Sequence, residues 1–472
     1  MNTNKFVHAV LRFYIAPIVN FIVGISTIYI TTRMFTPEEY GQINVFNAAA
    51  NVFMIFACFG FDQGFIRFFH ETPTGWSLKE LYRFCLRVVF VGWGICSVIL
   101  LLFYKQISIL LFHQENFYAI FLLCVFSMSI IFLNRFANNY YRVQENAKYY
   151  TIQQIITNTL MKMTVMMSIL FSLELSNILF FNTIGVFAFF LILLITQRNI
   201  IIKNIPCLDH RILSVTKFSV TTWPTSVMFM LATFITPLLI TMRMDSYDVG
   251  IYTSTNVFSS VIGVLTSGFL TYWSVFIYKN YKKEQDFIKK VHNYIIISIL
   301  IILSGMIILQ HVAYLFIGEQ FQSGRYFFTL VIVDTLLMFL GESTQYGIAI
   351  TKKVYQSTLI FAIALILKIV GTWVVLPIAG LLGAAVVAAI AATVRFVLLS
   401  WRGQKYYQSI ESVRKTFVGI ILIWMLALSN CVFIDDYIKE CLAVSIILSI
   451  ALAVYYSNFK DMTIVIKRKL LK

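Results

Sequence analysis

Apolar runs about twenty residues long recur along the whole sequence, with only short polar segments between them. Of the 472 residues, 59% are hydrophobic and 12% are charged, whereas a soluble domain carries about 25% charged residues. A helix of about 20 apolar residues spans a bilayer, so the pattern predicts an all-α integral membrane protein with about fourteen transmembrane helices. The predicted spans cover residues 8–32, 42–69, 84–104, 117–140, 149–172, 177–197, 217–241, 250–277, 291–315, 326–349, 355–376, 381–401, 416–434 and 440–457.

The distribution of basic residues predicts how these spans are oriented. With the N-terminus in the cytoplasm, 29 of the 37 Lys and Arg side chains fall on the cytoplasmic side, 5 outside and 3 in the middle of the membrane. The 21 acidic side chains divide as 8, 10 and 3. Cytoplasmic loops of membrane proteins carry an excess of Lys and Arg, so both termini are expected in the cytoplasm. The net charge of +16 is thereby attributed to topology and not to nucleic acid binding.

Two stretches of the chain resemble each other and predict two related halves. Shifting residues 33–47 by 209 positions places Gly41 on Gly250 and Asn47 on Asn256. Six spans are an even number, so both halves begin on the same side of the membrane, and a cavity is expected between them. The predicted domains are an N-terminal six-helix lobe (1–212), a C-terminal six-helix lobe (213–403), and an appended helix hairpin with a basic tail (404–472).

No motif in the sequence predicts catalysis, a cofactor or a metal site. The phosphate-binding loop, the HExxH zinc motif and the nucleophile elbow are all absent. The seven cysteines are scattered without a CxxC pair, and the six histidines are isolated. The expectation is therefore a secondary transporter that is not an enzyme.

A polar stripe in the fifth predicted span is the sharpest functional feature of the sequence. Gln154, Asn158 and Lys162 follow at i, i+4 and i+8 and share one helix face. An ionisable side chain inside the membrane is costly unless it faces protein or a water-filled cavity. Lys162 is therefore expected either to line a cavity or to pair with an acid such as Asp334 or Glu342.

Further polar side chains in the predicted spans are candidates for the same cavity. Arg395 could instead reach the cytoplasmic surface along its apolar stem. Arg67 could instead pair with Asp62, although a spacing of five residues places the two only partly on one face. The basic candidates are Lys162, Lys368, Arg395, Arg67 and Arg135, and the polar candidates are Asn47, Asn51, Gln154 and Asn158.

Three acidic residues in the predicted spans allow two interpretations. Asp62, Asp334 and Glu342 could neutralise the basic residues inside the membrane. Alternatively they could bind a coupling proton or sodium ion, as intramembrane carboxylates often do.

The stretch from Arg33 to Phe69 also carries a family resemblance. Its polar turn ends in EEYG, and the helix that follows ends in the GFDQ and FIRFF cluster. This arrangement resembles the first helix pair of the O-antigen and capsule repeat-unit flippases, the Wzx-type polysaccharide transporter family. That family belongs to the superfamily of multidrug, oligosaccharidyl-lipid and polysaccharide exporters. The resemblance implies two six-helix lobes, in some members with two extra helices.

The resemblance further implies what such a protein would transport. It would flip undecaprenyl-diphosphate-linked oligosaccharide repeat units from the cytoplasmic to the external leaflet of a bacterial inner membrane. Expected partners are this lipid-linked glycan, membrane lipids, and in addition a polysaccharide polymerase and a chain-length regulator. The product would serve O-antigen and lipopolysaccharide synthesis.

Two other classes of function compete with this interpretation. A cation-coupled drug or metabolite exporter of the same superfamily would need an acidic and aromatic site. Asp62, Asp334 and Glu342 are consistent with such a site, whereas the basic residues in the middle of the membrane disfavour it. A membrane-embedded glycosyltransferase or ligase would need a substantial extramembrane loop. The longest loops here are only about twenty residues, so the sequence favours the flippase.

Overall fold

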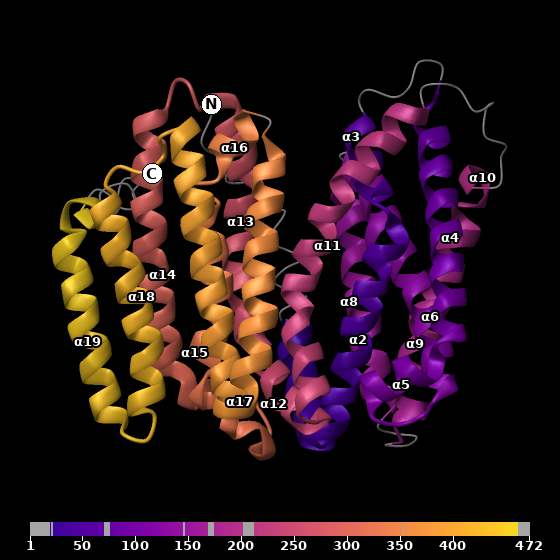
Figure 1. The fold of residues 1–472 in the computed structure, drawn as a ribbon, viewed down its shortest axis with the longest axis horizontal. Coiled ribbons are helices and arrows are strands. Elements are labelled where there is room, and N and C mark those ends of the chain that lie inside the picture. The colour runs from indigo at the N-terminus through magenta and orange to yellow at the C-terminus, as the bar shows by residue number, and fades with distance from the viewer. Residues whose placement is uncertain are drawn as a thin grey trace. The chain divides into compact units, whose positions relative to one another are not determined.

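The computed structural model describes residues 19, 22–69, 76–144, 147–168, 174–201, 212–351 and 353–460. Within these residues the chain is helical and contains no strand (Figure 1). The helices form two compact units, of which the first ends at Thr253 and the second begins at Ser254. The predicted division of the chain at residues 212 and 403 stays a prediction.

The first unit begins with a helix over residues 22–34, which is the described part of the first predicted span. Its other elements are α2 (Pro37–Cys58), α3 (Phe61–Phe68), α4 (Leu78–Leu102), α5 (Tyr104–Phe112), α6 (Phe117–Ile130), the π-helix η1 (Ile131–Ala137), α7 (Asn138–Val143), α8 (Ala147–Ser168), α9 (Leu175–Thr196), α10 (Arg198–Ile201), α11 (Ile212–Arg243) and α12 (Ser246–Ser254).

The second unit continues from α12 to the C-terminal hairpin. Its elements are α13 (Asn256–Asn280), α14 (Gln285–Tyr314), the 3-10 helix η2 (Glu319–Tyr326), α15 (Phe328–Gly341), α16 (Tyr346–Ile350), α17 (Val354–Tyr406), α18 (Val413–Phe433) and α19 (Tyr437–Val454).

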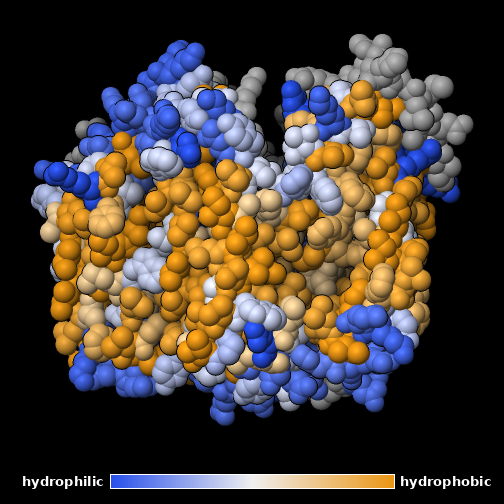
Figure 2. Space-filling model, in the orientation of Figure 1, coloured by the Kyte–Doolittle hydropathy of each residue, from blue (hydrophilic) through white to orange (hydrophobic). Residues whose placement is uncertain are grey.

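The helices have the length and surface of membrane-spanning segments. Nine of those in the described part of the chain are long and apolar enough to cross a bilayer, and the bent pair η2 and α15 makes a tenth. In each unit, the face visible in Figure 2 is a broad hydrophobic surface with hydrophilic residues gathered at its ends. The predicted class, an all-α integral membrane protein, is confirmed, while the count of fourteen spans stays a prediction.

The second predicted span differs from the structure at both its start and its middle. The segment interpreted as a polar turn is the first turn of α2, because Thr36 and Glu39 form a capping box and Pro37 occupies the first helical turn. The span is also not continuous. Phe59 and Gly60 adopt left-handed backbone angles (φ 44° and 76°) and separate α2 from α3.

The long helix α17 is a hairpin of two helices. Gly380 has φ 56° and ψ −147°, a backbone conformation that strongly favours glycine, and it marks a kink between the two halves. The side chains of Gln356 and Tyr406, near the opposite ends of α17, are hydrogen-bonded at 2.8 Å, so the halves run antiparallel. The spans predicted at 355–376 and 381–401 are therefore the two arms of α17.

The two glycines of the predicted repeat meet at a crossing between α2 and α12. A Cβ atom added to Gly41 would lie 1.7 Å from the carbonyl oxygen of Ser246. One added to Gly250 would lie 1.9 Å from the carbonyl oxygen of Pro37. Ser246 follows Pro37 by 209 residues, as Gly250 follows Gly41, so the two halves of this contact are equivalent. We call this contact the glycine crossing.

The C-terminal hairpin of α18 and α19 packs on α14 and α15 through buried polar contacts. The fully buried His292 of α14 places Nδ1 2.7 Å from Ser343 Oγ and Nε2 2.9 Å from Thr416 Oγ1 on α18. The hydroxyl of Thr329 on α15 donates to the carbonyl oxygen of Ala427 at 2.9 Å. The hairpin is thus an integral part of the second unit.

Candidate functional site

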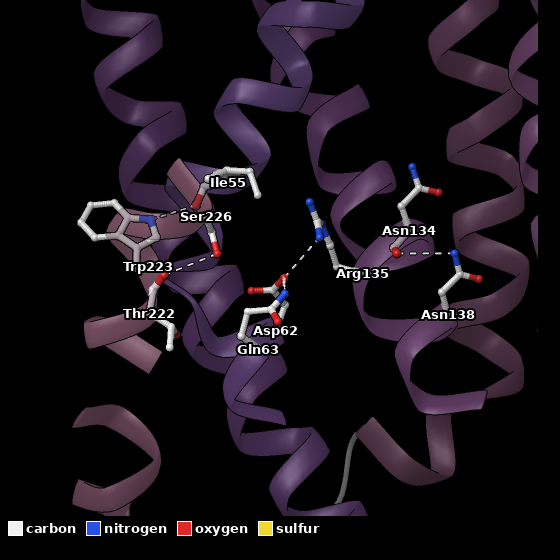
Figure 3. Close-up of polar contacts among 9 residues, drawn as sticks. All are labelled: Ile55, Asp62, Gln63, Asn134, Arg135, Asn138, Thr222, Trp223 and Ser226. Carbon is white, nitrogen blue, oxygen red and sulfur yellow. Dashed lines mark hydrogen bonds and ion pairs between the residues drawn. The ribbon is translucent and has the colours of Figure 1, made fainter. Parts of the chain in front are cut away.

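A buried ion pair joins α3 to η1 in the first unit. Asp62 lies in the first turn of α3 and is 2% exposed. Arg135 Nη1 lies 3.5 Å from Asp62 Oδ2, and Gln63 Nε2 donates to the same oxygen at 3.1 Å (Figure 3). A buried carboxylate needs such partners because the charge has been removed from water. Asp62 is therefore held as one half of an ion pair with Arg135.

The π-helix η1 positions Arg135 for this contact. A π-helical turn is wider than an α-helical turn and often occurs at functional sites. The Leu133 carbonyl oxygen accepts a hydrogen bond from Gln153 Nε2 of α8 at 2.8 Å, which supports the turn from a neighbouring helix. Asn138 Nδ2 donates to the Asn134 carbonyl oxygen at 3.4 Å along the same segment (Figure 3).

Helix α11 packs closely against the break between α2 and α3. The indole Nε1 of Trp223 donates to the carbonyl oxygen of Ile55 at 3.0 Å, near the end of α2 (Figure 3). A Cβ atom on Gly60 would lie 2.1 Å from the Ser219 carbonyl oxygen of α11. Glycine at the break is thus required both by its left-handed backbone and by the nearby helix.

The predicted stripe on α8 is present as one row of half-buried side chains. Asn158 Nδ2 donates to Gln154 Oε1 at 3.3 Å, as expected of residues four apart. One turn further on, Lys162 points its ammonium group toward the first helix, where a Cβ atom on Gly24 would lie 3.0 Å from Lys162 Nζ. The stripe therefore ends in a cation beside a glycine of the first helix.

The two asparagines predicted on α2 are also half-buried. Asn51 Nδ2 donates to the Asn47 carbonyl oxygen at 2.8 Å. Asn47 Oδ1 accepts a hydrogen bond from Asn182 Nδ2 of α9 at 3.4 Å. Asn182 is fully buried and was not among the residues singled out from the sequence, because a single asparagine in an apolar run carries no periodic signal.

A cluster of one acid and two bases lies in the second unit. Arg395 Nη2 is 2.7 Å from Asp334 Oδ1, and Lys368 Nζ is 3.5 Å from Asp334 Oδ2. Lys368 and Arg395 come from the two arms of α17, which the kink at Gly380 brings together, whereas Asp334 comes from α15. The side chains of Lys368 and Arg395 are 8% and 11% exposed and that of Asp334 is 29% exposed. The structure thus brings together three predicted site residues and leaves the acid as the most accessible of them.

Glu342 and Arg67 lie outside these two groups of contacts. Glu342 accepts hydrogen bonds from Gln345 Nε2 at 2.7 Å and from the Tyr346 hydroxyl at 3.3 Å, both within its own segment. Arg67 is exposed at the last turn of α3, with its guanidinium 5.8 Å from the centre of the Phe68 ring. The ion pair of Asp62 is made with Arg135 and not with Arg67.

The described part of the chain contains no group of three or more His, Cys, Asp or Glu side chains that could hold a metal ion.

The fold is similar to two solved transporter structures. The structure described as "Lipid II flippase MurJ, inward closed conformation" aligns with a TM-score of 0.70 and 14% identity, covering 95% of this chain and 99% of that chain. A second, described as an inward-facing conformation of a multidrug resistance MATE family transporter of the MOP superfamily, aligns with a TM-score of 0.57 and 13% identity. It covers 82% of this chain and 94% of that chain. At these identities the likeness shows the fold.

No curated protein matches the sequence. One protein family does match, over residues 8–276, which is more than half of the chain. This match confirms the resemblance of the chain to polysaccharide transport proteins at the level of the family, while the Wzx type stays a prediction. The chain belongs to the family described as polysaccharide biosynthesis proteins.

Proposed function

We propose that the protein is a flippase for undecaprenyl-diphosphate-linked oligosaccharide repeat units. It moves the head group from the cytoplasmic to the external leaflet of a bacterial inner membrane by alternating access. The protein is not an enzyme in this proposal, and both termini lie in the cytoplasm. A polysaccharide polymerase and a chain-length regulator are the proposed partners on the product side.

The observation that carries this proposal is the presence of basic side chains at buried and half-buried positions within the helices. In the second unit, the two cations Lys368 and Arg395 share the single carboxylate of Asp334. In the first unit, the half-buried Lys162 ends a stripe of amide side chains. A diphosphate is recognised by charged donors of this kind, and amides suit the hydroxyl groups of a sugar. The substrate that these side chains would bind is thus an anion that carries sugar.

The helices of the first unit contain features that favour bending during transport. Helix α11 carries Pro224 and Pro237 within its length, and proline removes a backbone hydrogen bond and kinks a helix. The neighbouring α2 and α3 are separated by the break at Phe59 and Gly60. Transporters with two related lobes expose a central site alternately to the two sides of the membrane. The polyprenyl tail would stay in the lipid throughout.

A cation-coupled drug exporter is the alternative, and the contacts of the acids weigh against it. Such a protein needs carboxylates that can receive a cationic substrate. Asp62 and Asp334 are instead ion-paired with basic side chains of the protein. The third acid, Glu342, already accepts two hydrogen bonds.

Complementation of a strain that lacks the protein tests the proposal. The variants are Lys162→Gln and Lys368→Gln, and Lys105→Gln is the matched control because Lys105 is exposed and paired with Glu115 at the surface. Surface polysaccharide, lipid-linked repeat units retained inside the cell, and abundance of the protein in the membrane are measured together. Loss of surface polysaccharide with retained intermediate and normal abundance is the expected result for the two site variants.

Three results would overturn parts of the proposal. If both site variants export normally, Lys162 and Lys368 do not bind the diphosphate. If the strain without the protein accumulates no lipid-linked repeat units, the protein is not their flippase. Reduced abundance that recovers when Asp334 is also neutralised would assign Lys368 a structural role.

A further inference from the structure

A buried polar cluster joins four elements of the second unit, away from Asp334. It consists of one side chain each from η2, α18 and α19 and two from α14, which we name the α14–α19 cluster. Glu440, Gln310 and Asn430 are 0% exposed and Tyr314 is 1% exposed, while Arg325 is half-buried. Polar groups are rarely buried so completely unless hydrogen bonds or a bound species offset the cost of their desolvation.

The contacts inside the α14–α19 cluster connect Glu440 to α14, and α18 to η2. Gln310 Nε2 donates to Glu440 Oε1 at 2.5 Å. Asn430 lies across the α18–α19 turn from Glu440, and its Nδ2 donates to the Arg325 carbonyl oxygen at 2.9 Å. The Arg325 guanidinium Nη2 lies 3.1 Å from His311 Nδ1. These three contacts join α19 and η2 to the C-terminal end of α14, and α18 to η2.

Each member nevertheless keeps one buried polar atom without a hydrogen-bond partner. These atoms are Gln310 Oε1, Asn430 Oδ1, Glu440 Oε2, the Tyr314 hydroxyl and Arg325 Nε. A buried polar group left unpaired costs about 1–3 kcal/mol, so five in one place call for a bound species. Three of the five are oxygen acceptors and only one is purely a donor. The cluster therefore has more unpaired hydrogen-bond acceptors than donors.

We propose that Glu440 is a proton-binding site and that the protein carries it as a neutral carboxylic acid at neutral pH, with ordered water completing the cluster. The added proton turns the unpaired acceptor Oε2 into a donor, and an ordered water can accept its hydrogen bond. A water molecule supplies two further donors and can accept from Arg325 Nε. The proton and the water together therefore supply the hydrogen-bond donors that the cluster lacks.

The surrounding charges disfavour a metal ion at Glu440. Within the described residues no ion pair is formed by Glu440 within 4.0 Å, and Arg325, whose guanidinium is held by His311, brings a positive charge to the cluster. Asp435 accepts from the Tyr326 hydroxyl, and Asp436 pairs with Lys439 at 2.8 Å, so the acids of the turn are engaged at the surface. A single carboxylate beside a guanidinium is a poor metal site.

Infrared difference spectroscopy on the purified full chain tests this proposal without any transport assay. A protonated carboxylic acid has a carbonyl stretch well separated from that of a carboxylate. At pH 7, the spectrum of the wild type minus that of Glu440→Gln should contain this band. The matched control, Glu319→Gln, changes an exposed acid in the same unit and should give no such band. A difference spectrum with only carboxylate bands for Glu440→Gln overturns the proposal.

A second variant keeps the test decisive if Glu440→Gln does not fold. Gln310→Leu removes the hydrogen bond to Glu440 Oε1 and should shift the acid band while leaving it present. A band that does not move in Gln310→Leu would belong to another residue and contradict the proposal. Loss of the wild-type band on adding Na⁺ at constant pH would also overturn it, since the site would then take a metal cation.

Discussion

At the scale of single residues, the acid Asp334 has two cations to balance. Arg395 and Lys368 contact different oxygens of one carboxylate, at 2.7 and 3.5 Å. Removing either cation leaves an ion pair, whereas removing the acid leaves two largely buried positive charges. Breaking a buried ion pair by deleting one partner costs about 3–5 kcal/mol.

We therefore expect Asp334→Asn to lower the stability of the protein by about 3–5 kcal/mol, and Lys368→Met to lower it much less. Thermal unfolding of the purified variants in detergent measures the difference. Equal losses for the two variants would show that the cations are stabilised by something other than Asp334.

The sequence also does not indicate which distant residues form ion pairs and hydrogen bonds with one another. Asp62 and Arg135 are separated by α4, α5 and α6 along the chain, and nothing in either local pattern indicates that they meet. Nothing in the sequence of residues 131–137 distinguishes the π-helical turn that carries Arg135 from an α-helical turn. Gln153, which supports that turn, was overlooked in favour of its neighbour Gln154 because only Gln154 belongs to a periodic stripe.

At the scale of helices and turns, hydropathy predicted where the spans lie but not where they break. The apolar run continues through Phe59 and Gly60 without a polar residue, so only the backbone angles show the division of α2 from α3. The start of α2 could have been predicted, because Thr36, Pro37 and Glu39 are together a recognised helix start. In α17, the segment between the two predicted spans contains Gly380, and the structure kinks there.

The glycine crossing provides a test of helix packing. Gly41→Ala and Gly250→Ala each place a methyl group within 2 Å of a backbone carbonyl oxygen, at 1.7 and 1.9 Å. Each should therefore destabilise the protein by about 1–3 kcal/mol, the range for overpacking. Gly94→Ala is the control, since nothing lies within 4 Å of its added Cβ, and its unfolding temperature should stay the same or rise slightly. A crossing variant as stable as this control would mean that the two helices separate at little cost.

The start of α12 carries a pH-sensitive acid. Burial, and then the negative charge of Asp245, raise the pKa of Asp248 to about 6. The folded protein therefore keeps this proton up to about pH 6, whereas the unfolded chain releases it near pH 4. The contribution of Asp248 to the stability of the fold is fully present below pH 4 and is lost as the pH rises through about 6.

Asp248→Asn should remove this pH dependence and raise stability at pH 7 by about 1 kcal/mol once solvent screening is counted. Unfolding temperatures at pH 4.5 and pH 7.5 test this, with the wild type losing more than the variant between the two. An equal change with pH in both proteins would show that other groups dominate.

At the scale of the whole molecule, the charge pattern predicts which loops face the cytoplasm. Alkaline phosphatase fused after Glu115 should be active, because this loop is predicted outside and the enzyme needs an oxidising compartment to form its disulfides. The same fusion after Lys283 should be inactive, because the lysines around it mark a cytoplasmic loop. Activity in the reverse pattern would invert the proposed direction of transport.

The glycine crossing also has a meaning for the origin of the chain. Gly41 approaches Ser246 as Gly250 approaches Pro37, and each contact is the other moved by 209 residues. Such reciprocity is the mark of an isologous interface, the kind formed by two identical subunits about a twofold axis. If the predicted halves arose by duplication, an ancestor bearing this surface would have paired with a second copy of itself. In a homodimer every substitution appears twice, but in a fused chain each side changes alone. In the two predicted halves, that freedom would allow one to hold Lys162 beside Gly24 and the other to hold two cations around Asp334.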